Sequence, residues 1–172
     1  NIFALSNDPR RAAIYHCDEH VLKMILECCQ MLYTCHWVLE SSHLESWEET
    51  VGVKPYKKTH ENHPCCIWIR KAKENYFWVV ELGLGLCEEY TFRYGKTHAS
   101  EKHLIALREH IPEALPILGK RLKFVQAMPE DHRHPTNAIE GYKTYYRSKV
   151  FTNGKRPSWK RTRKAPKWYS IQ

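Results

Sequence analysis

The stretch HCDEHVLKMILE, residues 16–27, lies in a region whose apolar residues have the period of a helix. Asp8-Pro9 upstream is a favourable helix start, because Asp is a preferred N-cap and Pro is preferred at the first helical position. No Gly or Pro interrupts the chain from there to Leu39. Apolar residues recur at alternating steps of three and four, at Ile14, Cys17, Val21, Met24, Cys28, Met31 and Cys35. This pattern predicts one long helix from about Pro9 to Leu39 with a buried stripe.

A polar stripe follows the same helix beside the apolar one. At about 100° per residue, six polar side chains fall within about 40° of one line. They are His16, His20, Lys23, Glu27, Gln30 and Thr34. A solvated helix face usually favours Glu–Lys pairs, so this choice of residues indicates a face that lines a cleft. The alternative is the solvated face of an ordinary amphipathic helix.

Helices and long loops also account for the rest of the chain. Apolar periodicity between Gly or Pro stops predicts further helices over residues 62–94, 100–112 and 136–149. We expect a break in the first of these around residues 73–75, a stop at Gly95, and a close helix crossing at Gly83 and Gly85. Polar or Pro-rich segments predict long loops over residues 41–62 and 112–135. The predicted fold class is mainly α, with a single helical domain over residues 1–153.

The chain length, the apolar runs and the cysteines indicate the number of domains and the compartment of the protein. A chain of 172 residues suits one domain, and no apolar run reaches the roughly eighteen residues that a membrane-spanning helix needs. The first residues do not have the charge order of a signal peptide. Seven cysteines, an odd number without a CxxC motif, indicate reduced and mostly buried thiols. We therefore expect a protein of the cytoplasm or nucleus of the host cell that is not secreted.

Nearly all of the net charge of +8 lies in the last 19 residues. Residues 154–172 hold seven basic side chains and no acidic one, whereas the other 20 basic residues are offset by 19 acidic ones. Trp159, Trp168 and Tyr169 are interleaved with these charges. Basic residues neutralise phosphates and aromatic rings stack on bases, so this C-terminal segment, packed on the domain or extending from it, predicts nucleic-acid binding. The alternative is a solubilising end.

Two other segments are candidates for contacting DNA. The run Lys57–His63, KKTHENH, offers groups for phosphates, and QAMP at residues 126–129 offers Gln126 as a polar reader and Met128 as an apolar wedge. Both could instead be simple connectors. The full set that we expect to contact DNA is Arg10, Arg11, His16, Lys23, Lys57, Lys58, His60, Asn62, His63, Gln126, Lys155, Arg156, Trp159, Lys160 and Arg161.

The polar stripe permits two chemistries. His16 and His20, four residues apart on a helix, could ligate a metal ion with His60 or His63 and Glu27. Alternatively, Glu27 in a partly desolvated cleft could move protons and orient a covalent intermediate, with His20 and Lys23 binding phosphate nearby.

A family resemblance favours the second chemistry. Asp18-Glu19-His20, with Glu27 seven residues later, resembles the phage pyrimidine-dimer DNA glycosylases of the endonuclease V type, which have D-Q-H and a catalytic Glu at the same spacing. Residues 75–95 resemble the family's second long helix, and the RPSW at residues 156–159 resembles its C-terminal R-P-T-W segment. The resemblance covers about half of the chain. The chain also resembles uncharacterised virus and phage proteins with YHCDxHVxKM, KxTHxNHP and QAMP segments.

The resemblance implies a small, monomeric, metal-independent helical protein that acts on double-stranded DNA without a cofactor. In that family the N-terminal α-amine attacks C1′ of the damaged nucleotide, a Schiff base forms, and β-elimination nicks the strand. By position, the catalytic residues would be Asn1, Glu27 and His20. The segment before Asp18 is several residues longer than in the family, and further length lies in residues 41–62 and 97–135, so substrate recognition is expected to differ.

The function predicted from the sequence is thus a DNA glycosylase with AP-lyase activity on damaged or modified pyrimidines. Two alternatives are a nucleic-acid-binding protein without catalysis and a metal-dependent nuclease or hydrolase that uses His16 and His20.

Overall fold

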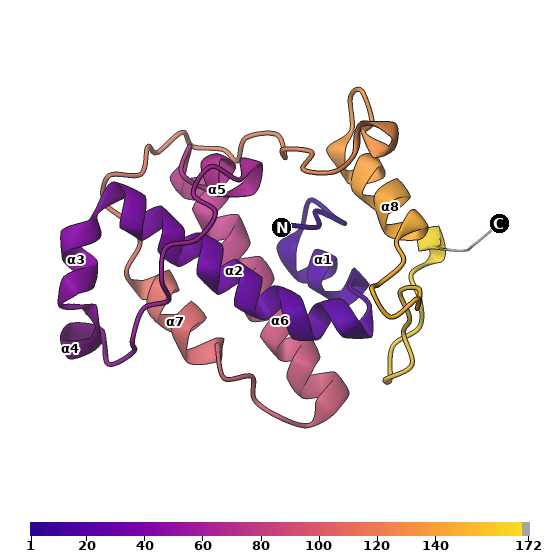
Figure 1. Cartoon of the computed structure of the whole chain (residues 1–172), viewed down its shortest axis with the longest axis horizontal. Coiled ribbons are helices and arrows are strands. Elements are labelled where there is room, and N and C mark those ends of the chain that lie inside the picture. Colours follow the sequence, from indigo (N-terminus) through magenta and orange to yellow (C-terminus); the bar gives the residue numbers. More distant parts are fainter. Residues whose placement is uncertain (170–172) are drawn as a thin grey trace.

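The computed structural model describes residues 1–169, which form a single all-α domain without strands in that range. The predicted mainly helical fold is confirmed. The α-helices are α1 (Pro9–Tyr15), α2 (Asp18–Leu39), α3 (Ser41–Glu45), α4 (Trp47–Val51), α5 (Pro64–Ile69), α6 (Lys73–Tyr94), α7 (Glu101–Glu109) and α8 (Ala138–Ser148). Short 3-10 turns lie at Glu130–His132 and Lys167–Tyr169. The long helices α2 and α6 form the centre, with α3 and α4 at one end and α8 with the C-terminal segment at the other (Figure 1).

The prediction of one continuous helix from Pro9 to Leu39 is wrong, because the chain is extended at His16 and Cys17. Contacts from distant parts of the chain stabilise this break. The backbone N–H of Cys17 donates to the Tyr146 hydroxyl at 2.8 Å. The Arg93 guanidinium donates to the carbonyls of Ile14 at 3.1 Å and His16 at 2.8 Å. These groups replace the helical hydrogen bonds that the break removes.

The predicted long loop over residues 41–62 is wrong in its first half, where α3 and α4 form. Each of these short helices buries one large side chain, Leu44 at 3% exposure and Trp47 at 2%. The other boundaries lie close to those predicted. The break before α6 is at residues 70–72, and Gly95 ends that helix in the left-handed conformation with φ 65°.

The predicted close crossing at Gly83 and Gly85 is confirmed. A Cβ atom at Gly83 would lie 2.7 Å from the Leu104 side chain of α7, and one at Gly85 would lie 3.0 Å from Ala13 Cβ of α1. Because real Cβ contacts are longer, α6 can approach both neighbours only where it lacks side chains.

All seven cysteines are free and buried, as the sequence predicted. Burial raises the pKa of each thiol, to about 12 for Cys28, so the thiols are protonated and unreactive at neutral pH. No helix within residues 1–169 has the length and apolar content needed to span a membrane.

Residues 154–169 lie against the helical domain, whereas residues 170–172 of the predicted C-terminal segment fall outside the described residues. The Asp18 carboxylate accepts from the backbone N–H of Lys160 at 2.7 Å, and Glu89 accepts from the Arg163 guanidinium at 2.6 Å. Tyr169 is buried, at 5% exposure. The segment is therefore held by ion pairs and by aromatic packing.

Three histidines, His16, His20 and His36, are almost fully buried, and burial lowers their pKa values to about 4, 2 and 3. In the unfolded chain each would bind a proton near its ordinary pKa of 6.5, so acid favours unfolding. Above pH about 6.5 these histidines should not lower the free energy of unfolding. Below that pH we expect the free energy of unfolding to fall by about 1.4 kcal/mol per pH unit for each buried histidine.

Urea unfolding between roughly pH 7 and pH 5 measures this slope. His36→Gln should flatten it, because the variant no longer buries that neutral imidazole. An equal slope in the His36 variant and the wild type would contradict the burial of a neutral imidazole.

Candidate active site

The site begins with an N-terminal strap, residues 2–5, whose four side chains are at most 3% exposed. This burial fixes the position of Asn1. Its side-chain amide donates to the Ala127 carbonyl at 3.1 Å, and its side-chain oxygen accepts from the Ile2 N–H at 2.8 Å and from the Cys65 thiol at 3.3 Å. The first residue of the described chain is thus rigidly held.

The α-amine of Asn1 lies 2.5 Å from Glu27 Oε2 and donates a hydrogen bond to it. The other carboxylate oxygen of Glu27 lies 3.5 Å from Lys23 Nζ. Both the Asn1 and Glu27 side chains are about three-quarters buried, at 26% and 23% exposure. The arrangement therefore pairs an amine with a carboxylate in a partly desolvated position that solvent and a ligand can still reach.

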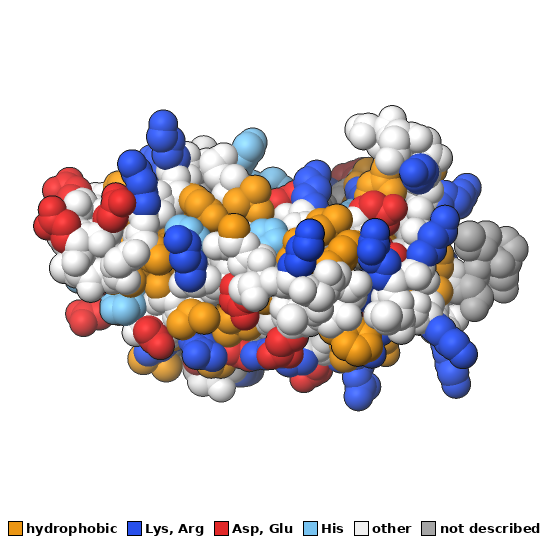
Figure 2. Space-filling view, turned by 90° about the horizontal axis from the view of Figure 1, so that it is seen from below, with side chains coloured by type: hydrophobic (Ala, Val, Ile, Leu, Met, Phe, Trp, Pro, Cys, Tyr) orange, Lys and Arg blue, Asp and Glu red, His pale blue; other side chains and the backbone are white. Residues whose placement is uncertain are grey.

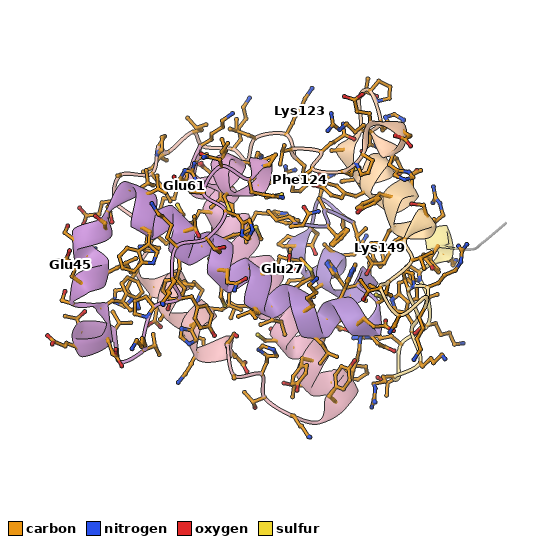
Figure 3. The ribbon with its side chains drawn as sticks, in the orientation of Figure 1. Glu27, Glu45, Glu61, Lys123, Phe124 and Lys149 are labelled. Atoms are coloured by element: carbon orange, nitrogen blue, oxygen red, sulfur yellow. The ribbon has the colours of Figure 1, made fainter. Side chains whose placement is uncertain are left out.

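Two pockets meet at this pair. The lysine pocket, of about 390 Å³, is lined by Asn1 and Glu27 together with His20, Lys23, Lys149 and Phe151, among others. The imidazole pocket, of about 280 Å³, is lined by Asn1 and Glu27 together with Gln30, Thr59, His60 and His63, among others. Glu27 and Lys149 lie in the region between α2 and α8 (Figure 3). Either pocket could receive part of a ligand whose reacting atom sits at the amine.

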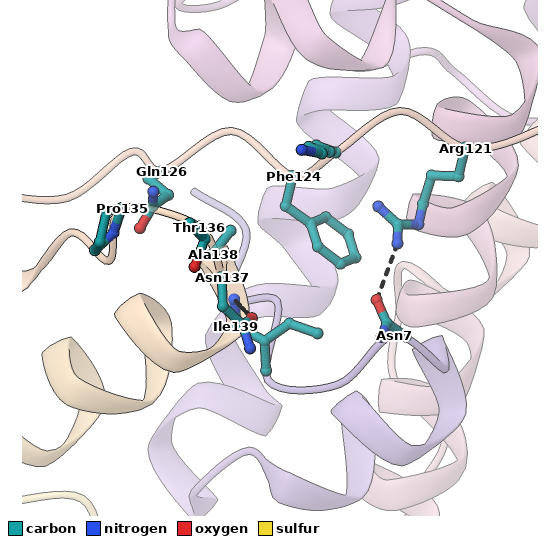
Figure 4. A pocket seen from close by; sticks show the side chains of 10 residues that line it. Asn7, Arg121, Phe124, Gln126, Pro135, Thr136, Asn137, Ala138 and Ile139 are labelled. Atoms are coloured by element: carbon teal, nitrogen blue, oxygen red, sulfur yellow. Dashed lines mark hydrogen bonds between the residues drawn. The ribbon is translucent and has the colours of Figure 1, made fainter.

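Three further hollows extend this row across the surface, and each neighbouring pair shares a lining residue. A hollow of about 610 Å³ beside α5 shares His63 with the imidazole pocket, and Gln126 links it to a hollow at the start of α8 (Figure 4). On the other side, Glu19 links the lysine pocket to a hollow beside the C-terminal segment.

Basic side chains line every part of this row except the imidazole pocket, where two histidines stand instead. We call the row the basic track, after its cations Lys23, Arg121, Lys123, Arg133, Lys149, Lys155, Lys160 and Arg161. Exposed acidic side chains gather instead at the end of the molecule formed by α3 and α4 (Figure 2). The charge of the track suits a phosphate backbone.

Several residues predicted from the sequence line the track. They are Asn1, His20, Lys23, Glu27, His60, His63, Gln126, Lys155, Lys160 and Arg161. The others, Arg10, Arg11, His16, Lys57, Lys58, Asn62, Arg156 and Trp159, line none of these hollows.

Burial corrects the roles predicted for the two helix histidines. His16 is completely buried, with Nδ1 bonded to the Ala12 carbonyl at 2.7 Å, so it cannot reach DNA. His20 is 3% exposed, stacks on Phe3 with ring centroids 4.6 Å apart, and bonds the Tyr146 hydroxyl at 2.8 Å. Because burial lowers its pKa to about 2, His20 is neutral and cannot bind phosphate as a cation. It packs and orients the N-terminal strap instead.

Two other predicted DNA contacts are engaged in ion pairs. Arg10 pairs with Glu81 and Glu88 of α6, away from the track, and these carboxylates neutralise its charge. Lys58 pairs with Glu61 at 2.8 Å within its own loop.

The Gln126 and Met128 side chains of the QAMP segment mainly make contacts within the protein. Met128 is 5% exposed, so it is part of the core and cannot act as a wedge. The Gln126 side chain donates to the His134 carbonyl and accepts from the His134 N–H, both at 2.8 Å. This pair of bonds closes the loop before α8 and leaves Gln126 at the wall of a hollow.

The metal alternative requires His16 and His20 to converge with a third ligand. Their ring centroids lie 6.2 Å apart. Within the described range of the chain, no three His, Cys, Asp or Glu side chains gather closely enough to share a metal ion.

Trp159 packs inward against Tyr169 and Tyr146, with ring centroids 4.5 and 6.2 Å apart. Its indole nitrogen is buried. We therefore expect Trp159→Ala to lower the free energy of unfolding by about 2 kcal/mol, since a large ring that fills partly buried space is lost. The dependence of DNA affinity on salt should not change, because no charge is removed.

Arg156→Ala is the matched control for Trp159→Ala, since Arg156 is exposed three residues earlier. Its unfolding should be unchanged, and a phosphate contact would show as a decrease of about 0.9 in the slope of log affinity against log salt. Unchanged thermal stability of the Trp159 variant, together with weaker DNA binding, would contradict the packing role. It would support the stacking of Trp159 on bases that the sequence predicted.

Sequence reasoning missed Lys149, Phe3 and Phe151, which line the lysine pocket with the amine and Glu27. Their positions beside Glu27 depend on how the N-terminal strap and α8 meet, and no linear motif marks them. The one available signal was Lys149 at the expected end of the last helix. Comparisons with protein-family models, curated proteins and solved structures gave no match to this chain.

Proposed function

We propose that this protein is a DNA glycosylase with AP-lyase activity that removes damaged or modified pyrimidines, with an arrangement like that of the endonuclease V family. The observation that carries the proposal is the 2.5 Å contact between the Asn1 α-amine and Glu27. An amine beside a carboxylate, in a partly buried position between two pockets, is what imine chemistry at a sugar carbon needs.

In the proposed reaction, the Asn1 amine gives one proton to Glu27 and attacks C1′ of the deoxyribose. The C1′–N bond to the base breaks, and the base leaves with the proton that Glu27 had taken from the amine, which returns Glu27 to its carboxylate form. Opening of the sugar ring places a proton on O4′ and gives an iminium ion between the amine and C1′. Glu27 then removes a proton from C2′, and the 3′ phosphate leaves by β-elimination. Water hydrolyses the imine and restores the free amine, so no cofactor is consumed.

The basic track supports double-stranded DNA as the partner, because its cations extend on both sides of the amine. Flipping one nucleotide out of the stack would bring C1′ to the Asn1–Glu27 pair, with one of the two adjoining pockets receiving the base. We propose that the protein acts as a monomer. Its buried reduced thiols suit the cytoplasm or nucleus.

Borohydride trapping tests the proposal. Protein that begins with a free Asn1 amine is incubated with a duplex that contains an abasic site, and borohydride reduces any imine to a stable covalent bond. We expect a covalent complex whose mass equals protein plus DNA, with the link mapped to Asn1. The matched control carries one extra Met before Asn1, which turns the Asn1 nitrogen into an amide and moves the amine away from Glu27.

Trapping should be lost or strongly reduced in this control, while binding to the duplex persists. Binding without trapping by the free-amine protein would contradict the glycosylase proposal and favour a non-catalytic nucleic-acid-binding protein.

A further inference from the structure

Among the described residues, the positive charge of Lys149 is not paired with a carboxylate. It follows α8 directly and lines the lysine pocket. No carboxylate within residues 1–169 lies within 4.0 Å of its ammonium group. Instead the ammonium lies 5.2–5.9 Å from the centres of three aromatic rings, those of Tyr145, Phe3 and Phe151. Aromatic faces compensate a partly buried charge only in part, so the site is left able to accept an anion.

The other charges of the lysine pocket do not supply this anion. Glu27 is already paired with the Asn1 amine and is near Lys23. Glu19 also lines the pocket, but no ion pair of the described residues joins it to Lys149. His20 is buried and neutral. Burial and the repulsion from Lys23 lower the pKa of Lys149, and the weaker attraction from Cys17 and Glu27 does not offset them. An incoming anion would relieve both effects.

The two sides of the Asn1–Glu27 pair therefore differ. The lysine pocket presents Lys23 and Lys149, whereas the imidazole pocket presents His60 and His63. Burial lowers the pKa of His63, so that side chain is neutral at pH 7. A DNA strand that places a sugar at the amine also places one phosphate on each side of that sugar. Only one of these phosphates would meet lysine side chains.

We propose that Lys149, assisted by Lys23, binds the backbone phosphate next to the reacting deoxyribose. This inference rests on the proposed function, because the amine defines where the sugar sits. It adds a direction to the site: the strand is held by lysines on the lysine-pocket side, and the phosphate on the imidazole side meets histidines instead. Lys149 is a binding residue in this account, and the Asn1 amine remains the nucleophile.

The test uses a duplex with a tetrahydrofuran abasic analogue, which cannot form an imine and so reports binding alone. Lys149→Gln removes the charge and keeps much of the length, whereas Lys149→Arg keeps the charge. Lys102→Gln is the matched control, since Lys102 is exposed on α7 and lines none of the hollows. Each protein is measured on the normal duplex and on two duplexes with a neutral methylphosphonate, one 5′ and one 3′ of the analogue.

We expect Lys149→Gln to weaken binding to the normal duplex by about tenfold and to lower the salt slope by about 0.9, as for one lost phosphate contact. Lys149→Arg and Lys102→Gln should bind nearly as tightly as the wild type. On one of the two methylphosphonate duplexes the loss caused by Lys149→Gln should vanish, because the partner phosphate is already neutral. That duplex identifies the phosphate that Lys149 contacts.

Two results would overturn the inference. One is an equal loss on all three duplexes, which would mean that Lys149 acts only through long-range charge. The other is a borohydride-trapped peptide that maps to Lys149, which would make this lysine the nucleophile. Inorganic phosphate that competes with the normal duplex only in proteins with a cationic residue 149 would support the site. A failure of imine trapping at Asn1 would leave the tetrahydrofuran result unaffected, so the two proposals fail separately.

Discussion

Glu27→Gln should abolish strand cleavage at abasic sites while leaving DNA affinity nearly unchanged. The glutamine side chain has almost the same size, but it cannot take the proton from the Asn1 amine or from C2′. A positioned acid–base group contributes typically about 10²–10⁴-fold to a rate, so we expect a loss of that order in single-turnover cleavage. Removing a carboxylate from the basic track should not weaken phosphate binding, because it lessens repulsion.

The matched control is Glu48→Gln on α4, an exposed carboxylate that lines none of the hollows. Its cleavage rate and its melting temperature should equal those of the wild type. Full cleavage activity in the Glu27 variant would remove the carboxylate from the mechanism, and the 2.5 Å contact with the amine would then be only structural.

Arg93→Met should cause the largest loss of stability in this protein. The Arg93 side chain is fully buried and pairs with Glu89 at 2.8 Å and Asp18 at 3.1 Å. It also donates to the carbonyls at the break between α1 and α2. Without the guanidinium, the two carboxylates each lose one of their partners inside the protein and the two carbonyls lose a donor. Breaking a buried ion pair in this way costs about 3–5 kcal/mol. Urea unfolding at neutral pH measures the difference.

The pH dependence gives this prediction a second test. Burial alone would raise the pKa of Glu89, but the hydrogen bonds from Arg163 and Arg93 outweigh it and hold the pKa below its ordinary value of 4.5. A carboxylate with a lowered folded pKa contributes stability above its unfolded pKa and loses it as pH falls through the folded one. The difference between wild type and variant should therefore shrink below pH 4.5.

Arg108→Met is the control for the Arg93 variant, since Arg108 is exposed on α7 and has no ion pair among the described residues. A change of less than about 0.5 kcal/mol is expected there. A similarly small change in Arg93→Met would show that the buried network is not needed for the fold.

Local sequence signals located most of the helices but not the break between α1 and α2. Helix caps and glycine stops act within a few residues, which is why Asp8, Pro9 and Gly95 marked boundaries well. The break at His16 and Cys17 depends on Arg93 and Tyr146, which are 77 and 129 residues away. No property of the local sequence distinguishes this segment from a continuous helix.

The same limit applies to the site. The helical period placed His16, His20 and Glu27 on one line of the helix. It did not predict that α8 would cover His16 and His20 and leave Glu27 accessible. Tyr146 of α8 bonds both His20 and the Cys17 backbone. Under this cover His16, a predicted DNA contact, and His20, a predicted catalytic residue, are core residues. Residues from opposite ends of the chain that form one pocket, such as Asn1 and Lys149, can be identified only after the chain is folded.

The buried N-terminal strap has a practical consequence for anyone who expresses this protein. With residues 2–5 fixed in the core and the Asn1 amine directed at Glu27, a fusion partner or affinity tag on that end would fill the space in front of the carboxylate and remove the primary amine. Under the proposed function, library screens that use amino-terminal tags would then score the protein as inactive. A tag on the carboxyl end, or one removed by a protease that leaves Asn1 as the first residue, avoids such false negatives.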